Sequence, residues 1–266
     1  MKPRRIWTAA AALLITLGVA APSWANTPKI TELRIQPASL VIAHERDARR
    51  LLVSGLTEAG EWVDLTRDAE LIAPPGSLRI DADGYVHPVA AGKANLSVAA
   101  AGKRVTVAVT VESIAPPPIS FVREIMPQLS KLGCNAGTCH GSAKGKNGFK
   151  LSLRGYDPDS DYHALIQDIS GRRFNRAFPG QSLMLLKPTS EVPHKGPQVV
   201  APGSTDYELL KTWIEEGVVS DVGSTTRVER LEVLPAAVDI AMPEMQQQVL
   251  VLAHYADGST RDVTRE

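Results

Sequence analysis

Short runs that alternate apolar and polar residues fill the stretch from Ile30 to Ser113. The clearest runs are Leu33-Arg34-Ile35, Leu78-Arg79-Ile80 and Arg104 to Val111. Asp83-Gly84 and Ala101-Gly102 separate several of these runs, and such pairs are typical of tight hairpin turns. Because a period of two places alternate side chains on one face of a strand, this stretch predicts an all-β sandwich with a buried inner face.

The pattern changes after the proline-rich residues 114–118, which predict a stiff linker. Apolar residues at helical spacing then predict a short helix, and they are Phe121, Val122, Ile125, Leu129 and Leu132. A closing helix is predicted from Thr205 to Gly217, with a capping box formed by Thr205 and Glu208. We therefore expect residues 119–221 to form a mainly α domain.

Part of the β-rich pattern recurs 198 residues later without a gap. The matched pairs include Leu33/Leu231, Pro37/Pro235, Gly60/Gly258, Asp64/Asp262, Thr66/Thr264 and Arg67/Arg265. Residues 226–266 therefore predict the start of a second sandwich. Half of a sandwich leaves its apolar face and its strand edges uncovered, so we expect a fragment of a longer protein or completion by another chain.

Residues 1–25 have the features of a secretory signal peptide. Basic residues at Lys2, Arg4 and Arg5 precede an apolar run, and Ser23-Trp24-Ala25 is a small-x-small cleavage site. No other apolar run is long enough to span a membrane, so no transmembrane helix is expected in the mature chain. The sequence thus predicts an exported protein of the periplasm or the cell surface.

Charge and motif content exclude several classes of function. The chain has 29 basic and 29 acidic residues, and loss of the three basic residues of the signal leaves a net charge of about −3. That balance gives no indication of nucleic-acid binding. Convincing Ser-His-Asp, paired-carboxylate and phosphate-loop patterns are missing from the sequence, so hydrolase and nucleotide chemistry are not predicted.

The chain has only two cysteines, Cys134 and Cys139, and His140 directly follows the second. Two nearby thiols followed by a histidine are typical of covalent haem attachment, in which the histidine is the first axial ligand of the iron. Four residues separate the cysteines instead of the usual two, and Asn135 and Gly137 would let this longer loop turn. The leading prediction is one covalent haem c.

Two other uses of the same residues remain open. In an oxidising compartment Cys134 and Cys139 could form a disulfide, which would leave His140 as an ordinary polar residue. A zinc site would need a fourth ligand at long range, from His163 or His194.

Further motifs lie in the β-rich segments, and they are Leu33-x-Ile35-x-Pro37, Gly84-Tyr85-Val86-x-Pro88-x-Ala90-x-Gly92-x-Ala94 and Tyr255-x-Asp257-Gly258-Ser259-x-Arg261-Asp262-Val263-Thr264. Both segments resemble the bacterial group 2 immunoglobulin-like domains. The resemblance implies spacers or adhesive modules, which contact a cell surface or a polysaccharide in some surface proteins.

The middle segment carries a second set of motifs, namely Gly133-Cys134-Asn135-Ala136-Gly137-Thr138-Cys139-His140-Gly141, Gly148-Phe149-Lys150-Leu151-Ser152-Leu153-x-Gly155-Tyr156-Asp157-Pro158, Ser182-Leu183-x-Leu185-x-Lys187-Pro188 and Pro193-His194-x-Gly196. Over residues 119–218 it resembles the planctomycete-type cytochrome c domains of large exported proteins. The resemblance implies haem binding and electron transfer, and no known substrate.

The same resemblance bears on the sixth ligand of the iron. Related domains with the shorter cysteine spacing usually present a methionine about 50 residues after the attachment histidine, and here His194 occupies the equivalent place. We therefore expect His140 and His194 to be the axial ligands. Met184 is the alternative sixth ligand, although its apolar run is also explained by a packed core methionine.

Other residues of the middle segment have expected supporting roles. Phe149 and Leu151 are predicted to pack against the haem ring and keep water from the iron. Arg172 and Arg173 are candidates to neutralise the haem propionates, and the local excess of basic residues would steer an acidic redox partner protein.

The predicted architecture is multidomain: a signal peptide (1–25), an all-β immunoglobulin-like sandwich (28–113), a linker (114–118), a mainly α cytochrome c-like haem domain (119–221) and a truncated second immunoglobulin-like domain (226–266). The predicted function is an exported c-type cytochrome that transfers single electrons, since two protein ligands leave no open position on the iron for catalysis. One alternative is a surface adhesion or carbohydrate-binding protein with a disulfide-stapled middle domain. The other is a haem oxidase or peroxidase.

Overall fold

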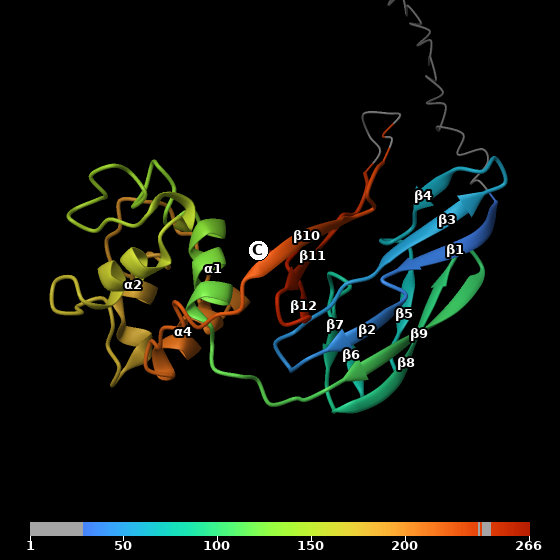
Figure 1. Cartoon of the computed structure of the whole chain (residues 1–266), viewed down its shortest axis with the longest axis horizontal. Helices are drawn as coiled ribbons and strands as arrows, with labels where there is room; N and C mark the ends of the chain where they lie inside the picture. Colours follow the sequence, from blue (N-terminus) through green and yellow to red (C-terminus); the bar gives the residue numbers. More distant parts are fainter. Residues whose placement is uncertain (1–28, 239, 241–245) are drawn as a thin grey trace, which may run out of the picture.

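The computed structural model describes residues 29–238, 240 and 246–266, so the predicted signal peptide lies outside the described residues. Three units follow one another along the chain (Figure 1). We call them the first β unit (29–113), the middle unit (119–221) and the second β unit (226–266). Within the described part of the chain, no helix is long and apolar enough to cross a membrane.

The first β unit is a sandwich of two sheets. One sheet has the order β1 (Ile30–Gln36), β3 (Leu52–Thr57) and β4 (Trp62–Asp64), and the other has the order β2 (Ser39–Ile42), β9 (Lys103–Val111), β8 (Gly92–Ala100) and β5 (Glu70–Ile72). A separate pair is formed by β6 (Leu78–Ile80) and β7 (Val86–Pro88). The alternate apolar residues meet between the sheets in one buried core, where Ile42, Val53, Leu96 and Val107 are at most 1% exposed.

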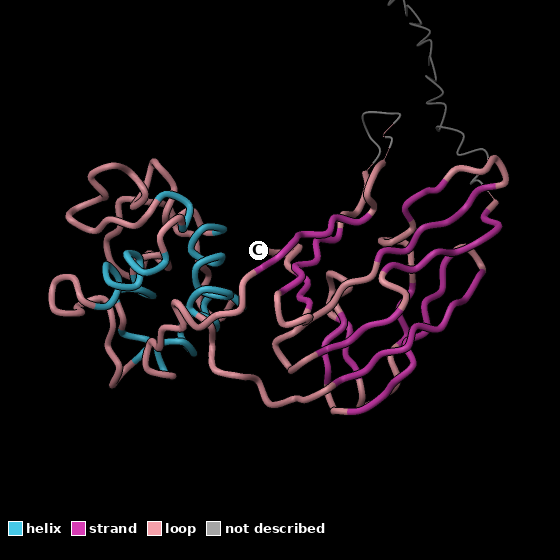
Figure 2. The backbone as a smooth tube through the Cα atoms, in the orientation of Figure 1, coloured by secondary structure: helices cyan, strands magenta, loops and turns pink. Residues whose placement is uncertain are grey.

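Short helices and long loops form the middle unit. Its helical elements are the π-helix η1 (Phe121–Ile125), α1 (Met126–Lys131), the 3-10 helix η2 (Leu153–Gly155), α2 (Pro158–Ile166), the 3-10 helix η3 (Pro179–Gln181), α3 (Leu183–Leu186) and α4 (Thr205–Glu215). Figure 2 shows the short helices of this unit in cyan among its pink loops.

The prediction of a mainly α cytochrome c-like domain was wrong. The described residues of the middle unit contain four α-helices, and the longest, α4, has only 11 residues. Helical spacing is present in the sequence only near the two ends of this unit. Between them Gly145, Gly148 and Gly155 adopt positive φ angles, a conformation that interrupts a helix. The chain as a whole is therefore mostly β, with a loop-rich centre (Figure 2).

The helix ends differ slightly from the predicted ones. Ser120 caps η1, since its hydroxyl oxygen accepts a hydrogen bond from the Arg123 backbone at 2.8 Å. In α4 the capping residue is Ser204, which accepts from the Tyr207 backbone at 3.2 Å, so the predicted capping box at Thr205 lies one residue too late. Gly217 follows this helix with φ +93°, as expected for a glycine at a helix end.

Aromatic side chains form the centre of the middle unit. Trp213 and Phe121 are fully buried, with ring centres 5.4 Å apart. Phe174 packs edge-on against Trp213 at 5.6 Å, and the indole nitrogen donates to the Val219 carbonyl at 2.9 Å. This cluster joins the first helix of the unit to the last, so the loops between them are fixed to one core.

The second β unit repeats the strand pairing of the first. Its sheet has the order β10 (Val228–Leu234), β11 (Leu250–Tyr255) and β12 (Thr260–Asp262). Val233 pairs with Val251 as Ile35 pairs with Val53, which is the same register at an offset of 198 residues. A side-chain hydrogen bond also recurs: the Thr264 hydroxyl accepts from Val251 at 3.0 Å, as the Thr66 hydroxyl does from Val53.

Reciprocal hydrogen bonds hold the two β units together. The carboxylate of Asp64 accepts from the Gln248 backbone at 2.6 Å, and that of Asp262 accepts from the Arg50 backbone at 2.9 Å. Asp262 is the repeat equivalent of Asp64, and Gln248 that of Arg50. Each β unit therefore supplies one acceptor and one donor at equivalent positions, as in a two-fold symmetric interface.

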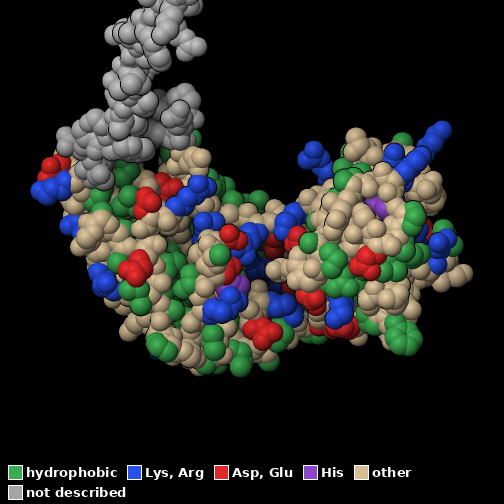
Figure 3. Space-filling model, turned by 180° about the vertical axis from the view of Figure 1, so that it is seen from behind, with side chains coloured by type: hydrophobic (Ala, Val, Ile, Leu, Met, Phe, Trp, Pro, Cys, Tyr) green, Lys and Arg blue, Asp and Glu red, His purple; other side chains and the backbone are tan. Residues whose placement is uncertain are grey.

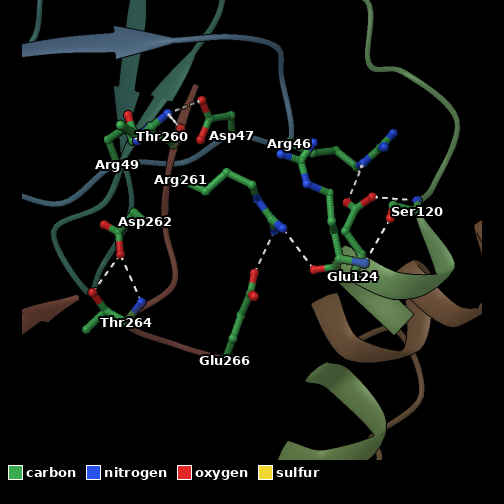
Figure 4. A network of polar contacts seen from close by, with 11 residues as sticks. Arg46, Asp47, Arg49, Ser120, Glu124, Thr260, Arg261, Asp262, Thr264 and Glu266 are labelled. Atoms are coloured by element: carbon green, nitrogen blue, oxygen red, sulfur yellow. Dashed lines mark hydrogen bonds and ion pairs between the residues drawn. The ribbon is translucent and has the colours of Figure 1, made fainter. Parts of the chain in front are cut away.

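Charged residues also connect the β units to the middle unit. Arg46 reaches Glu124 at 3.4 Å, and Arg261 donates to the Arg123 carbonyl at 2.8 Å (Figure 4). Figure 3 shows side chains of both signs gathered in the hollow between the units. These contacts orient the middle unit relative to both β units.

Candidate haem site

The loop from Gly133 to Gly141 folds back on itself directly after α1. Its start is fixed to that helix by the Cys134 backbone, which donates to the Leu129 carbonyl at 2.9 Å. Its end returns to the start, because the His140 backbone donates to the Cys134 carbonyl at 3.0 Å. A Cβ atom on Gly141 would lie 1.9 Å from the Asn135 carbonyl oxygen, so this close approach requires glycine. Both cysteines and His140 are thus held on one compact turn.

Two buried polar residues hold the loops around this turn, and the sequence analysis did not single out the second, Asp161. Asn135 is 1% exposed, and its amide donates to the Ser130 hydroxyl at 2.8 Å. Asp161 is also 1% exposed, and its carboxylate accepts from the Ser152 hydroxyl at 2.7 Å, while burial raises its pKa. The available signal for Asp161 was its position four residues before the buried Leu165, on the inner face of α2.

His140 is positioned as a metal-binding histidine would be. Its Nδ1 lies 3.0 Å from the Phe149 carbonyl oxygen. A neutral imidazole protonated at Nδ1 donates to that carbonyl and keeps the lone pair of Nε2 free. Histidine ligands usually make such a hydrogen bond to a carbonyl or carboxylate, because it fixes the ring orientation and the tautomer.

The fold brings His194 opposite this ring, although 54 residues separate the two histidines in the sequence. The ring centres are 6.3 Å apart and the rings are 17° from parallel. Two imidazoles that bind one metal from opposite sides have centres roughly 6 Å apart, since each bond is about 2 Å and each nitrogen lies about 1 Å from its ring centre. The ring centres of the histidine pair, His140 and His194, therefore match that separation, and their planes are stacked.

Hydrogen bonding leaves His194 less constrained than His140. Its Nδ1 is buried and has no hydrogen-bond partner among the described residues. A buried polar nitrogen without a partner costs free energy, which metal ligation or a bound group would recover. Both members of the histidine pair thus have nitrogen atoms that the rest of the protein does not use.

Both histidines are held in the neutral form. Burial lowers the pKa of His140, and the positive charges of Arg173 and Lys146 lower it further, against the opposing effect of the hydrogen bond to Phe149. Burial and Lys187 lower the pKa of His194. Ligation needs a neutral imidazole, and the lowered pKa values favour that form in both rings.

These shifts predict acid sensitivity of the haem-free chain. Because the folded pKa values of His140 and His194 lie below the ordinary value of about 6.5, the unfolded chain takes up protons first as the pH falls. The stabilisation is complete above that pH and is lost as the pH falls through the lowered values. We expect the denaturant concentration at the unfolding midpoint to decrease as the pH is lowered from 7.5 to 5.5. The decrease should be smaller in His194→Gln than in the unchanged chain. The exposed control His163→Gln should leave the dependence unchanged, and an equal effect of both variants would contradict the expectation.

The predicted supporting residues divide into two groups. Phe149 lies beside His140 with ring centres 4.4 Å apart, and the Arg173 guanidinium stacks on Phe149 at 4.0 Å. Arg173 also donates to the Ala164 carbonyl at 2.9 Å, so its charge is fixed close to the histidine pair. By contrast, Leu151 packs into the core of the middle unit, and Arg172 is exposed.

Met184 and His163 have other surroundings. Met184 is half-buried and packs against the core of the middle unit, in line with a packed core methionine. His163 is exposed on α2 and lies 3.9 Å from Asp159. The structure therefore places His194, and not Met184 or His163, opposite His140.

Both cysteines are free thiols and half-buried. Burial and the neighbouring Cys139 raise the pKa of Cys134 to about 11. Because the thiolate is the reactive form in disulfide exchange, this raised pKa disfavours disulfide exchange by Cys134 at neutral pH. Within the described ranges, no three His, Cys, Asp or Glu side chains converge as a metal site, so the zinc arrangement considered above is not formed there.

Comparison with known proteins gives no indication of what the site does, so a proposal for its function rests on its own residues. No protein-family model matches the chain, and no curated protein matches it.

Proposed function

We propose that the middle unit binds one haem covalently through Cys134 and Cys139, with His140 and His194 as the axial ligands of its iron. The protein would then be an exported electron carrier of the periplasm or the cell surface. The histidine pair carries this proposal: its ring spacing of 6.3 Å fits two ligands of one iron. Cys134 and Cys139, five positions apart in the sequence, would supply the attachment chemistry that the same haem would need.

Ligation from both sides favours electron transfer over catalysis. A bound haem supplies a one-electron iron couple, and two protein ligands leave no position on the iron for an external substrate. His140 is kept in one tautomer by the Phe149 carbonyl, and the Phe149 ring excludes water beside it. The fixed charge of Arg173 disfavours additional positive charge near His140, which favours the reduced state of the iron.

A basic surface close to His140 supports an acidic redox partner. Lys144, Lys146 and Lys150 are exposed on the loop that follows His140, and Arg154 is exposed just beyond it. Two apolar side chains lie in the same stretch, Leu153 at 54% exposed and Tyr156 at 90%. Positive charge beside exposed apolar groups suits transient docking, since charge steers the encounter and apolar contact holds it.

Covalent haem retention is the direct test of this function. The chain should be produced in a host with cytochrome c maturation and measured by absorption in both redox states and by the intact mass of the denatured protein. We expect sharp low-spin bands and the retained mass of one haem. Both should be lost in Cys134→Ala/Cys139→Ala, whereas the surface variant Lys144→Ala should keep them.

Two other results would contradict the proposal. A colourless protein about 2 Da lighter than its reduced form would indicate a disulfide, and hence the adhesion or carbohydrate-binding alternative. A coloured protein whose iron binds an external ligand without any mutation would indicate an oxidase or peroxidase site.

A further inference from the structure

The second β unit exposes a row of large apolar side chains. Leu231 is 62% exposed and Val233 49%, both on β10. Val238 at 47% and Ile240 at 55% follow that strand, and Val249 at 37% precedes β11. A contiguous exposed apolar surface of this kind usually marks a site of contact.

The first β unit shows what covers these positions. At an offset of 198 residues the five counterparts are Leu33, Ile35, Leu40, Ile42 and Leu51. Four of them are at most 9% exposed, and Leu33 is half-buried against the same core. That core lies between the β1–β3–β4 sheet and the β2–β9–β8–β5 sheet. The register of β10 with β11 equals that of β1 with β3, so Leu231, Val233 and Val249 lie on the face that is internal in the first unit. The counterparts of Val238 and Ile240 are on β2, which belongs to the opposite sheet of the first unit.

A cleft separates part of this face from the middle unit. Leu231 and Ala253 lie on its β side, and Val122, Pro127 and Pro158 form the opposite side. Arg123 lies across the cleft with its guanidinium 3.7 Å from the centre of the Tyr255 ring. Its Nε and Nη2 are buried and have no hydrogen-bond partner among the described residues. The cleft therefore has largely apolar walls, with the Arg123 guanidinium packed at its side against Tyr255.

We propose that this face receives a second β-sheet with the strand order and alternating apolar residues of β9–β8–β5. The covering sheet completes a sandwich over Leu231, Val233 and Val249, and its near edge lies in the cleft against the middle unit. In the first unit the corresponding strands β5, β8 and β9 lie within residues 69–111. This inference is independent of haem binding.

The chain itself provides the first test. An environment-sensitive dye should bind the protein, and binding should be lost in Leu231→Lys/Val233→Lys. The matched control is Val41→Lys, because Val41 is 50% exposed on the outer face of a completed sandwich. Sedimentation should show a monomer at all concentrations. A dimer that dissociates in the double variant would identify a second copy as the occupant and overturn the proposal, as would dye binding that the variant leaves unchanged.

A completed sheet provides the second test. The full chain is extended after Glu266 by a copy of residues 69–111, which contain β5, β8 and β9 of the sheet that covers β1–β3–β4 in the first unit. We expect the backbone amides that pair β10 with β11 to exchange more slowly, because the covering sheet opposes opening of this pairing, and dye binding to be lost. Val233→Lys in the extended chain should reverse both changes, and Val41→Lys should reverse neither. Exchange as fast as in the unextended chain would refute a covering sheet of this type.

Discussion

Replacement of Trp213 by alanine is expected to lower the free energy of unfolding of the middle unit by about 3–5 kcal/mol. The side chain is fully buried, lies 5.4 Å from Phe121 and 5.6 Å from Phe174, and donates its indole hydrogen to Val219. Alanine would leave a cavity at the junction of the first and last helices and an unpaired carbonyl. The loops that carry the histidine pair depend on that junction, so their order should be lost with it.

The measurement is hydrogen exchange of the α1 and α4 backbone amides, because it reports on the middle unit separately from the β units. Trp62→Ala is the matched control. Trp62 is 38% exposed and stacks under Arg34 at 3.7 Å, a contact of about 0.5–1 kcal/mol. Equal effects of the two variants would show that the aromatic cluster does not dominate the stability of the middle unit. Trp213→Phe should lie between them, because it keeps the ring and loses the hydrogen bond.

Replacement of His194 by alanine should have the largest effect on the haem-loaded protein. The variant keeps both cysteines and His140, so the haem mass should remain on the denatured chain. Loss of one axial ligand should change the spectrum from low spin to high spin and let carbon monoxide or imidazole bind. Added imidazole should restore the low-spin bands, because it fills the place of the missing side chain.

Two variants separate ligand loss from general damage. Met184→Leu keeps the volume of the side chain that packs against the core of the middle unit, and it should leave the spectrum unchanged. His163→Ala removes an exposed histidine on α2 and should also have no spectral effect. A high-spin spectrum in Met184→Leu, together with an unchanged one in His194→Ala, would assign the sixth position to the methionine instead.

The middle unit shows why helical spacing alone misjudged its fold. The apolar spacing of residues 121–132 and 205–217 is a local property, and helical structure is present at both places. Extension of that conclusion to the whole unit failed because the residues between these helices include glycines with positive φ, such as Gly145 and Gly148. Their structure depends on contacts such as that between His140 and Phe149, which no periodicity encodes.

The sequence by itself determined the features that short windows encode. These are the alternation that forms the strands of the first β unit, the offset of 198 residues that recurs in the pairing of β10 with β11, and the order of Cys134, Cys139 and His140. Only the tertiary structure decided which distant side chains meet. It brought the ring centres of His194 and His140 to 6.3 Å from each other and stacked Arg173 on Phe149. It also placed Asp64 and Asp262 where each accepts a hydrogen bond from the other β unit. Strand and helix patterns follow from local stereochemistry, whereas these contacts depend on loop closure and shared packing over long separations in the chain.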